Sequence, residues 1–155
     1  MNYWLMKSEP SSFSVDDLAR APHRTTVWDG VRNFQVRNML RDQINKGDLA
    51  FFYHSGGSTP GIAGTMKVSR SGYVDASAFD PQDHHFDPRS TLPKPLWYCV
   101  DVTLVKRFKC VVTLAELRRH AALKDMLILR RGNRLSISPV SAIHWQYILK
   151  LAAQT

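Results

Sequence analysis

The chain has 155 residues, of which 44% are hydrophobic and 22% are charged, as expected for one globular domain spanning residues 1–155 with its own core. Its 21 lysine and arginine residues against 13 aspartate and glutamate residues give a net charge of +8, which favours nucleic acid as a partner. No apolar run approaches the ~20 residues that span a bilayer, and the start does not resemble a signal peptide. We therefore expect no membrane contact and a cytoplasmic location.

The first half of the chain alternates short apolar runs with polar connections. A buried strand is predicted over 2–7, and Ser14 with Asp17 forms a capping box for a helix over 15–21. The next helix is predicted over 33–44, with Phe34, Met39, Leu40 and Ile44 on its buried side. Strands are predicted over 49–53 and 62–68, and in the latter Ile62, Gly64, Met66 and Val68 face one way.

The second half begins with a long segment, 70–95, that has no periodicity, and long loops in small domains are often functional. A strand is predicted over 97–105, and Thr113 with Glu116 caps a helix over 114–120. A short strand over 134–138 is expected to stop at Pro139, and Ser141 caps a last helix. About five or more strands, three or four helices and no βαβ alternation predict an α+β domain with an antiparallel, barrel-like sheet.

The common catalytic patterns are absent: the chain contains no GxGxxG, GxxxxGKS/T, HExxH, GxSxG or CxxC. We predict no catalytic residues. The segment DHHFD (83–87), with Asp80 upstream, is the best metal candidate, but the side chains of His84 and His85 should diverge in an extended loop. The Asp-Pro pairs around it are explained as turn starters, so we predict no metal site. Cys99 is interpreted as a small packed hydrophobe.

The segment TTVWDGVRNFQVRN (25–38) holds more hydrogen-bonding capacity than a helix entry needs. Reading a nucleobase requires a flat surface for stacking, fixed donors and acceptors for its edge, and cations for the phosphates. Trp28 is either such a surface or part of the core, and Asn33 is either a base contact or a helix N-cap. Gly30 would let backbone approach a ligand, and Arg32 and Arg37 would hold phosphates.

Taken together, YWLMKSEP, WDGVRNFQVRN, KGDLAFFYHS, PGIAGTMKV, PLWYCVDV and RRGNRLSISPV resemble an EVE domain of the PUA-like superfamily, from Tyr3 to Leu151. This resemblance implies a PUA-like antiparallel β-barrel with short peripheral helices. It also implies a non-catalytic domain that recognises a modified base, either a modified cytosine in DNA (5-methyl- or 5-hydroxymethylcytosine) or a modified RNA nucleotide. No cofactor is implied. The oligomeric state stays open, with a monomer favoured.

The resemblance also assigns the pocket to three segments and their neighbours. The first is the KSEP loop, the second is WDGVRN, and the third is the end of FFYHS. The expected nucleotide-binding residues are Lys7, Ser8, Glu9, Trp28, Gly30, Val31, Arg32, Asn33, Arg37, Tyr53, His54, Ser55, Trp97, Arg134 and Ser136.

Two other functions remain open at this point. An enzyme that processes a modified nucleotide would draw on a carboxylate or a histidine, and Glu9 and His54 are the residues to suspect. A protein-interaction module would use the basic surface to bind an acidic partner. Competition by a free modified nucleoside separates this module from a base reader, because only a base pocket is blocked by one.

Overall fold

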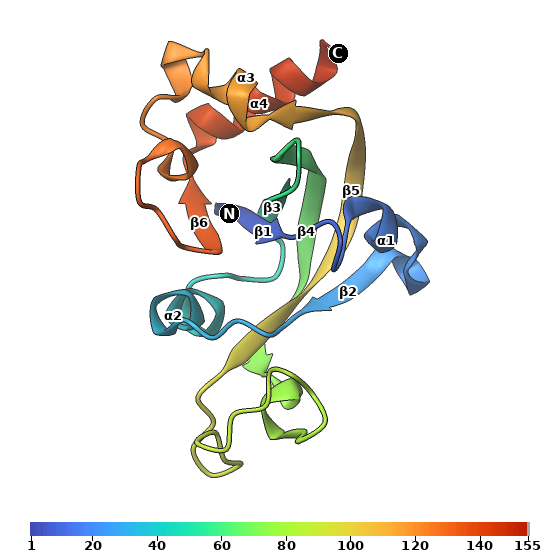
Figure 1. Cartoon of the computed structure of the whole chain (residues 1–155), viewed down its shortest axis with the longest axis vertical. Helices are drawn as coiled ribbons and strands as arrows, with labels where there is room; N and C mark the ends of the chain where they lie inside the picture. The colour runs from blue at the N-terminus through green and yellow to red at the C-terminus, as the bar shows by residue number, and fades with distance from the viewer. Residues whose placement is uncertain (155) are drawn as a thin grey trace.

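The structure is a computed structural model that describes residues 1–154. Six strands form one mixed sheet in the order β2-β5-β4-β3-β1-β6 (Figure 1). The strands are β1 (Tyr3–Ser8), β2 (Thr25–Trp28), β3 (Leu49–His54), β4 (Gly61–Val74), β5 (Tyr98–Thr113) and β6 (Ile137–Val140).

Residues 1–154 also form four α-helices and four short 3-10 helices. The predicted N-caps are confirmed: the side chains of Ser14, Asn33, Thr113 and Ser141 each accept a hydrogen bond from a backbone N–H of the first turn. Within residues 1–154, no helix has the length and apolar character needed to cross a bilayer. The helices are α1 (Val15–Arg20), η1 (Pro22–Arg24), α2 (Phe34–Asp42), η2 (Ala76–Phe79), α3 (Leu114–Arg118), η3 (Ala121–Leu123), η4 (Leu127–Leu129) and α4 (Ala142–Ala153).

The α+β class is confirmed, but the expected antiparallel β-barrel is not found, because the sheet formed by residues 1–154 is mixed and does not close. Strands β1 and β3 are parallel, with Tyr3 opposite Leu49, while the other neighbouring strands are antiparallel. The edge strands β2 and β6 do not pair with each other within residues 1–154. The parallel pair is possible because the chain passes through α1, β2 and α2 between β1 and β3, which is long enough for a crossover.

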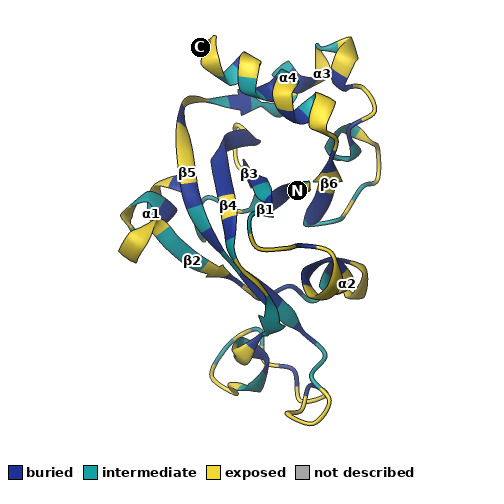
Figure 2. Ribbon diagram, turned by 180° about the vertical axis from the view of Figure 1, so that it is seen from behind, coloured by how far each residue is buried: buried dark blue, intermediate teal, exposed yellow. Residues whose placement is uncertain are grey.

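The central strands are buried on both faces, which explains their continuous apolar runs. In β1, Trp4 and Met6 lie in one core, whereas Leu5 lies in the other. Helix α2 covers the first core. Helix α4 covers the second through Trp145, whose ring stacks on Phe51 at 4.0 Å between centroids. Figure 2 shows the inner side of α4 buried and its outer side exposed.

Several predicted boundaries and faces differ from the structure. Strand β2 was missed, and β4 and β5 run far beyond their predicted ends because polar residues continue the paired ribbon. A β-bulge next to Ile62 turns this residue into the second core, so the regular alternation expected there is wrong. Pro139 lies inside β6 instead of ending it, which an edge strand tolerates. Phe34 is 48% exposed, and Val36 takes the buried position on α2.

The connection between β4 and β5 projects at the end of the molecule opposite α3 and α4 (Figures 1 and 2). Polar contacts hold its shape and fix it to the residues that follow β2. The Trp97 indole N–H donates to the Asp87 carboxylate at 2.8 Å, and Asp75 accepts from the backbone N–H of Gly30 at 2.9 Å. The segment is therefore an anchored loop that lies against the residues following β2.

Candidate functional site

A cavity of about 290 Å³ lies between the end of β1 and strand β2, near the lower end of the ~300–1,000 Å³ range of ligand pockets. Three of the predicted nucleotide-binding residues line it: Lys7, Ser8 and Trp28. The other lining residues were not among the predicted nucleotide-binding residues; they are Phe13, Thr26, Val27 and Asp29.

Backbone contacts hold the β1 side of this cavity. The backbone N–H of Lys7 donates to the carbonyl of Ser136 at 2.9 Å, which continues the pairing of β1 with the segment before β6. The Ser8 hydroxyl donates to the carbonyl of Phe13 at 2.7 Å, and the backbone N–H of Phe13 donates to the carbonyl of Glu9. These bonds fold the loop back, so that Phe13 closes one side of the cavity.

Trp28 forms the opposite wall and is at the same time a core residue. It is 8% exposed, and its ring packs edge-to-face on Phe52 at 5.4 Å between centroids. The two interpretations of Trp28 are therefore compatible, because the residue belongs to the core and also lines the cavity. The packing makes this wall rigid.

Two charged groups of opposite sign line the same cavity. Burial lowers the pKa of the Lys7 ammonium. Burial raises the pKa of the Asp29 carboxyl, the nearby Asp75 carboxylate raises it further, and His85 partly offsets the increase. The cavity thus offers a cationic donor and a carboxylate acceptor beside apolar walls, an arrangement suited to a flat ring with polar groups on its edge.

Gly30 has a left-handed backbone conformation with φ of +77°, but it serves packing within the protein rather than an approach to this cavity. A Cβ atom at this position would lie 2.6 Å from the ring of His85. Its N–H is occupied by Asp75. Val31 follows it into the first core, so neither residue lines the cavity.

Arg32 and Asn33 have structural partners of their own. Each guanidinium nitrogen of Arg32 donates to an acceptor inside the protein: the carbonyls of Val31 and His85, the Asp75 carboxylate or the Ser77 hydroxyl. Its N–H donors are therefore already used within the protein, which argues against the predicted contact of Arg32 with a phosphate. The side chain of Asn33 caps α2 by accepting from the N–H of Val36 at 3.0 Å, so the N-cap alternative is confirmed.

Three other predicted residues lie outside the cavity. Tyr53 is 3% exposed and belongs to the second core, on the other face of the sheet. Trp97 is 2% exposed and binds Asp87 at the base of the anchored loop. Arg37 donates to the carbonyl of Leu96 at 2.7 Å and lies over the ring of Phe34.

His54 lines a separate cavity of about 470 Å³ together with Arg107 and Lys109. Its Nε2 atom accepts a hydrogen bond from the backbone N–H of Val15 at 3.1 Å, which needs a neutral ring, and burial lowers its pKa accordingly. The remaining predicted residues do not line the first cavity: Glu9 and Arg134 are exposed, and Ser55 and Ser136 contribute backbone contacts to Ser8 and Lys7.

One sequence signal could have revealed the missing wall. The run TTVW (25–28) is β-branched and aromatic, which is typical of a strand. Read as a strand rather than as a turn, it would have placed Thr26 and Trp28 on one face and Asp29 directly after it. No comparable signal exists for Phe13, whose position depends on the Ser8 hydrogen bond.

Comparison with known proteins gives consistent matches over nearly the whole chain. The family model described as the EVE domain matches residues 2–151. Thymocyte nuclear protein 1 of Homo sapiens is 41% identical over 167 aligned residues, which cover 97% of this chain and 73% of that protein.

Solved structures agree with this match. The human THYN1 protein in complex with 5-methylcytosine containing DNA superposes with a TM-score of 0.92 at 40% identity, covering 98% of each chain. A protein of Pseudomonas syringae superposes with a TM-score of 0.91 at 44% identity, covering 97% of this chain and 99% of that one. These neighbours support a PUA-like fold.

Proposed function

The chain belongs to the EVE domain family, and on that premise we propose that it is a non-catalytic nucleic-acid-binding domain that recognises a modified cytosine in the cavity between β1 and β2. The observation that carries the proposal is the presence of the Asp29 carboxylate and the Lys7 ammonium on one partly apolar cavity. The human relative solved with DNA containing 5-methylcytosine supports the choice of ligand class.

The groups on the cavity wall complement the edge of cytosine. Cytosine carries an amino donor at N4, and carboxylates are side chains that accept from it. In the proposed complex Asp29 accepts from N4, and Lys7 donates to the carbonyl oxygen O2. The apolar side chains of Phe13 and Val27 would contact a methyl group at C5, which gives the modification a favourable place to bind.

The base has to leave its stack to enter this cavity. Extrusion costs a few kcal/mol in a duplex and less in a single strand. Contacts of the base with aromatic walls, about 1–3 kcal/mol per base, offset much of this cost. Phosphates next to the base would be held by the basic surface of the molecule, which carries a net charge of +8.

The two residues suspected for an enzyme, Glu9 and His54, do not line the proposed binding cavity. His54 lines a different cavity and is occupied by Val15, and Glu9 is exposed and does not line the site. We therefore expect no turnover when the purified protein is incubated with modified nucleotides, measured by chromatography of the products.

The test of the function is a titration with fluorescent oligonucleotides at one moderate salt concentration. Probes are unmodified or carry 5-methyl- or 5-hydroxymethylcytosine, in DNA and RNA, single- and double-stranded. We expect tighter binding of a modified probe and competition by the free modified nucleoside. Because Trp28 is also a core residue, the decisive variants are Asp29→Ala and Lys7→Met, and each should weaken modified-probe binding by about 5- to 150-fold, equivalent to 1–3 kcal/mol.

Matched control variants are Asp125→Ala and Lys150→Met, which alter exposed residues that do not line the cavity. They should bind like the unaltered protein. Equal binding of all probes by both sets of variants would reduce the site to a basic surface. Failure to bind any probe would favour the protein-interaction alternative.

A further inference from the structure

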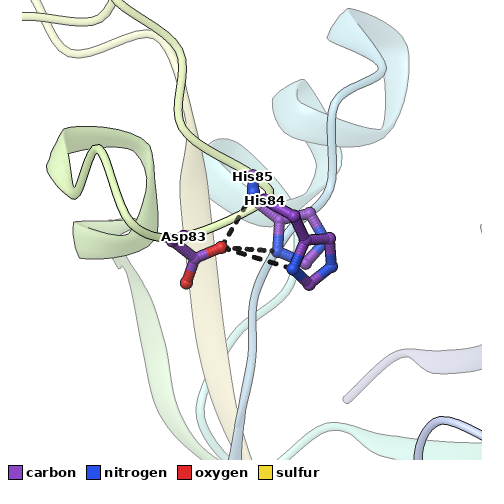
Figure 3. A group of neighbouring side chains, drawn as sticks. All are labelled: Asp83, His84 and His85. Atoms are coloured by element: carbon purple, nitrogen blue, oxygen red, sulfur yellow. Dashed lines mark hydrogen bonds and ion pairs between the residues drawn. The ribbon is translucent and has the colours of Figure 1, made fainter.

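Three side chains of types that can bind metal ions converge in the anchored loop between β4 and β5 (Figure 3). The Asp83 Oδ1 atom lies 3.2 Å from Nδ1 of His85 and 3.8 Å from Nδ1 of His84. The two imidazole rings lie 3.8 Å apart between centroids. One ligand atom from each residue falls within 4.8 Å of the others.

The expectation that the side chains of His84 and His85 diverge is therefore wrong. The reason is that they occupy the middle of a tight turn rather than an extended loop. The backbone N–H of Phe86 donates to the carbonyl of Asp83 at 3.0 Å, and the N–H of His85 donates to the Asp83 carboxylate at 2.8 Å. This curvature directs both Nδ1 atoms toward the same carboxylate oxygen.

We infer that Asp83, His84 and His85 form a binding site for a divalent first-row transition-metal ion of the zinc class. Zinc binds nitrogen and oxygen ligands at about 2.0–2.2 Å, which places tetrahedral ligand atoms about 3.3–3.6 Å apart. The Asp83–His85 separation already lies close to this value. His84 has a side chain that is 86% exposed, so it can make the small remaining movement without disturbing the core.

The chemistry of the ligands selects this class of ion. Two neutral imidazoles with one carboxylate suit zinc, nickel or copper, whereas magnesium prefers oxygen ligands and retains its water. The three residues leave further coordination positions open to solvent.

The loop is held in this shape by contacts that do not involve a metal. Arg32 donates two hydrogen bonds to the carbonyl of His85, at 3.0 and 2.7 Å, while it is paired with the buried Asp75. The ring of His85 packs against Gly30, directly after the proposed base-binding residue Asp29. A site whose backbone is already ordered loses little entropy on binding, which favours affinity.

The experiment is a calorimetric titration of the full chain, free of any histidine tag, with zinc chloride, nickel chloride and magnesium chloride. We expect one zinc ion per chain with micromolar affinity, similar behaviour for nickel and no saturable binding of magnesium. Zinc should also raise the thermal unfolding midpoint, because it binds the folded state preferentially.

The variants His84→Gln, His85→Gln and Asp83→Asn should each weaken zinc binding by at least about tenfold. His144→Gln, on α4, is the matched control and should bind zinc like the unaltered protein. Because His84 is exposed, its variant tests the site without a risk to folding, and its melting midpoint without metal should be unchanged. Absence of zinc binding, or an equal loss in His144→Gln, would overturn the inference.

Discussion

At the scale of single residues, Asp29 combines a proposed binding role with a cost to folding. Its carboxyl has a raised pKa, chiefly because burial disfavours the charged form. When the pKa of a carboxyl is higher in the folded than in the unfolded state, the group stabilises the fold most below its unfolded-state pKa. This contribution is lost as the pH rises through the folded-state pKa. At neutral pH the ionised carboxylate is therefore held at some expense of stability, as is common at functional sites.

The variant Asp29→Asn should accordingly unfold at a higher temperature than the unaltered protein at neutral pH. The residue is exposed, so solvent screens the charge and we expect a shift of at most about 4 °C, which is what 1 kcal/mol produces in a chain of this size. The difference in melting temperature should disappear below pH 3.8, the ordinary pKa of an aspartate carboxyl. The carboxyl is then protonated in both the folded and the unfolded state. Thermal melts over this pH range measure it, with Asp125→Asn as the control. A difference in melting temperature that does not depend on pH would show that the raised pKa of Asp29 is not its cause.

At the scale of elements, the contact between α2 and β4 depends on Gly72. A Cβ atom at this position would overlap the backbone carbonyl of Leu40, in the last turn of α2. Because the backbone of the helix lies directly on the strand here, side chains cannot adjust to relieve the overlap. Gly72 therefore sets how closely the last turn of α2 approaches β4.

The variant Gly72→Ala should lower the free energy of unfolding by about 1–3 kcal/mol, as expected for overpacking. The sign of the change in stability is informative. Without a clash, a glycine-to-alanine substitution stabilises a protein by about 0.4–1 kcal/mol, because it reduces the entropy of the unfolded chain. Urea denaturation followed by circular dichroism gives the value. An increase in stability would contradict the close packing of α2 on β4.

At the scale of the whole molecule, the net charge of +8 and the cavity between β1 and β2 should act on different parts of a nucleic acid. Contacts with phosphates release counterions and depend steeply on salt, whereas contacts with a base edge do not. The basic surface then sets the affinity for any strand, and the cavity sets the preference for a modified base.

Raising the salt concentration should therefore weaken binding of modified and unmodified single-stranded probes with the same slope. Each neutralised phosphate adds about 0.7 to the slope of log affinity against log salt on a single strand. The ratio of the two affinities should stay constant, and Asp29→Ala should lower the ratio without changing the slope. Anisotropy titrations at several salt concentrations measure both quantities. A preference that vanishes with salt would mean that the modified base is not read in a cavity.

Local sequence was sufficient for much of the secondary structure. Strands β1 and β3 were predicted because apolar runs identify buried strands, and the four N-caps because a cap and its partner lie within three residues. The resemblance of the motifs also identified the family, and three of the residues that it implies for binding, Lys7, Ser8 and Trp28, line the cavity.

Only the tertiary structure decided which of the predicted polar residues remain available to a ligand. Arg32 pairs with Asp75, which is 43 residues away in the chain, and Trp97 is bound by Asp87. The cavity joins the end of β1, Phe13 and β2, and no pattern in the sequence shows that Asp29 would line the same cavity as Lys7. The sequence by itself determined the helices and strands whose hydrogen bonds or hydrophobic pattern involve residues close together in the chain. The site depends on contacts between segments far apart in the chain, which form only when the sheet assembles.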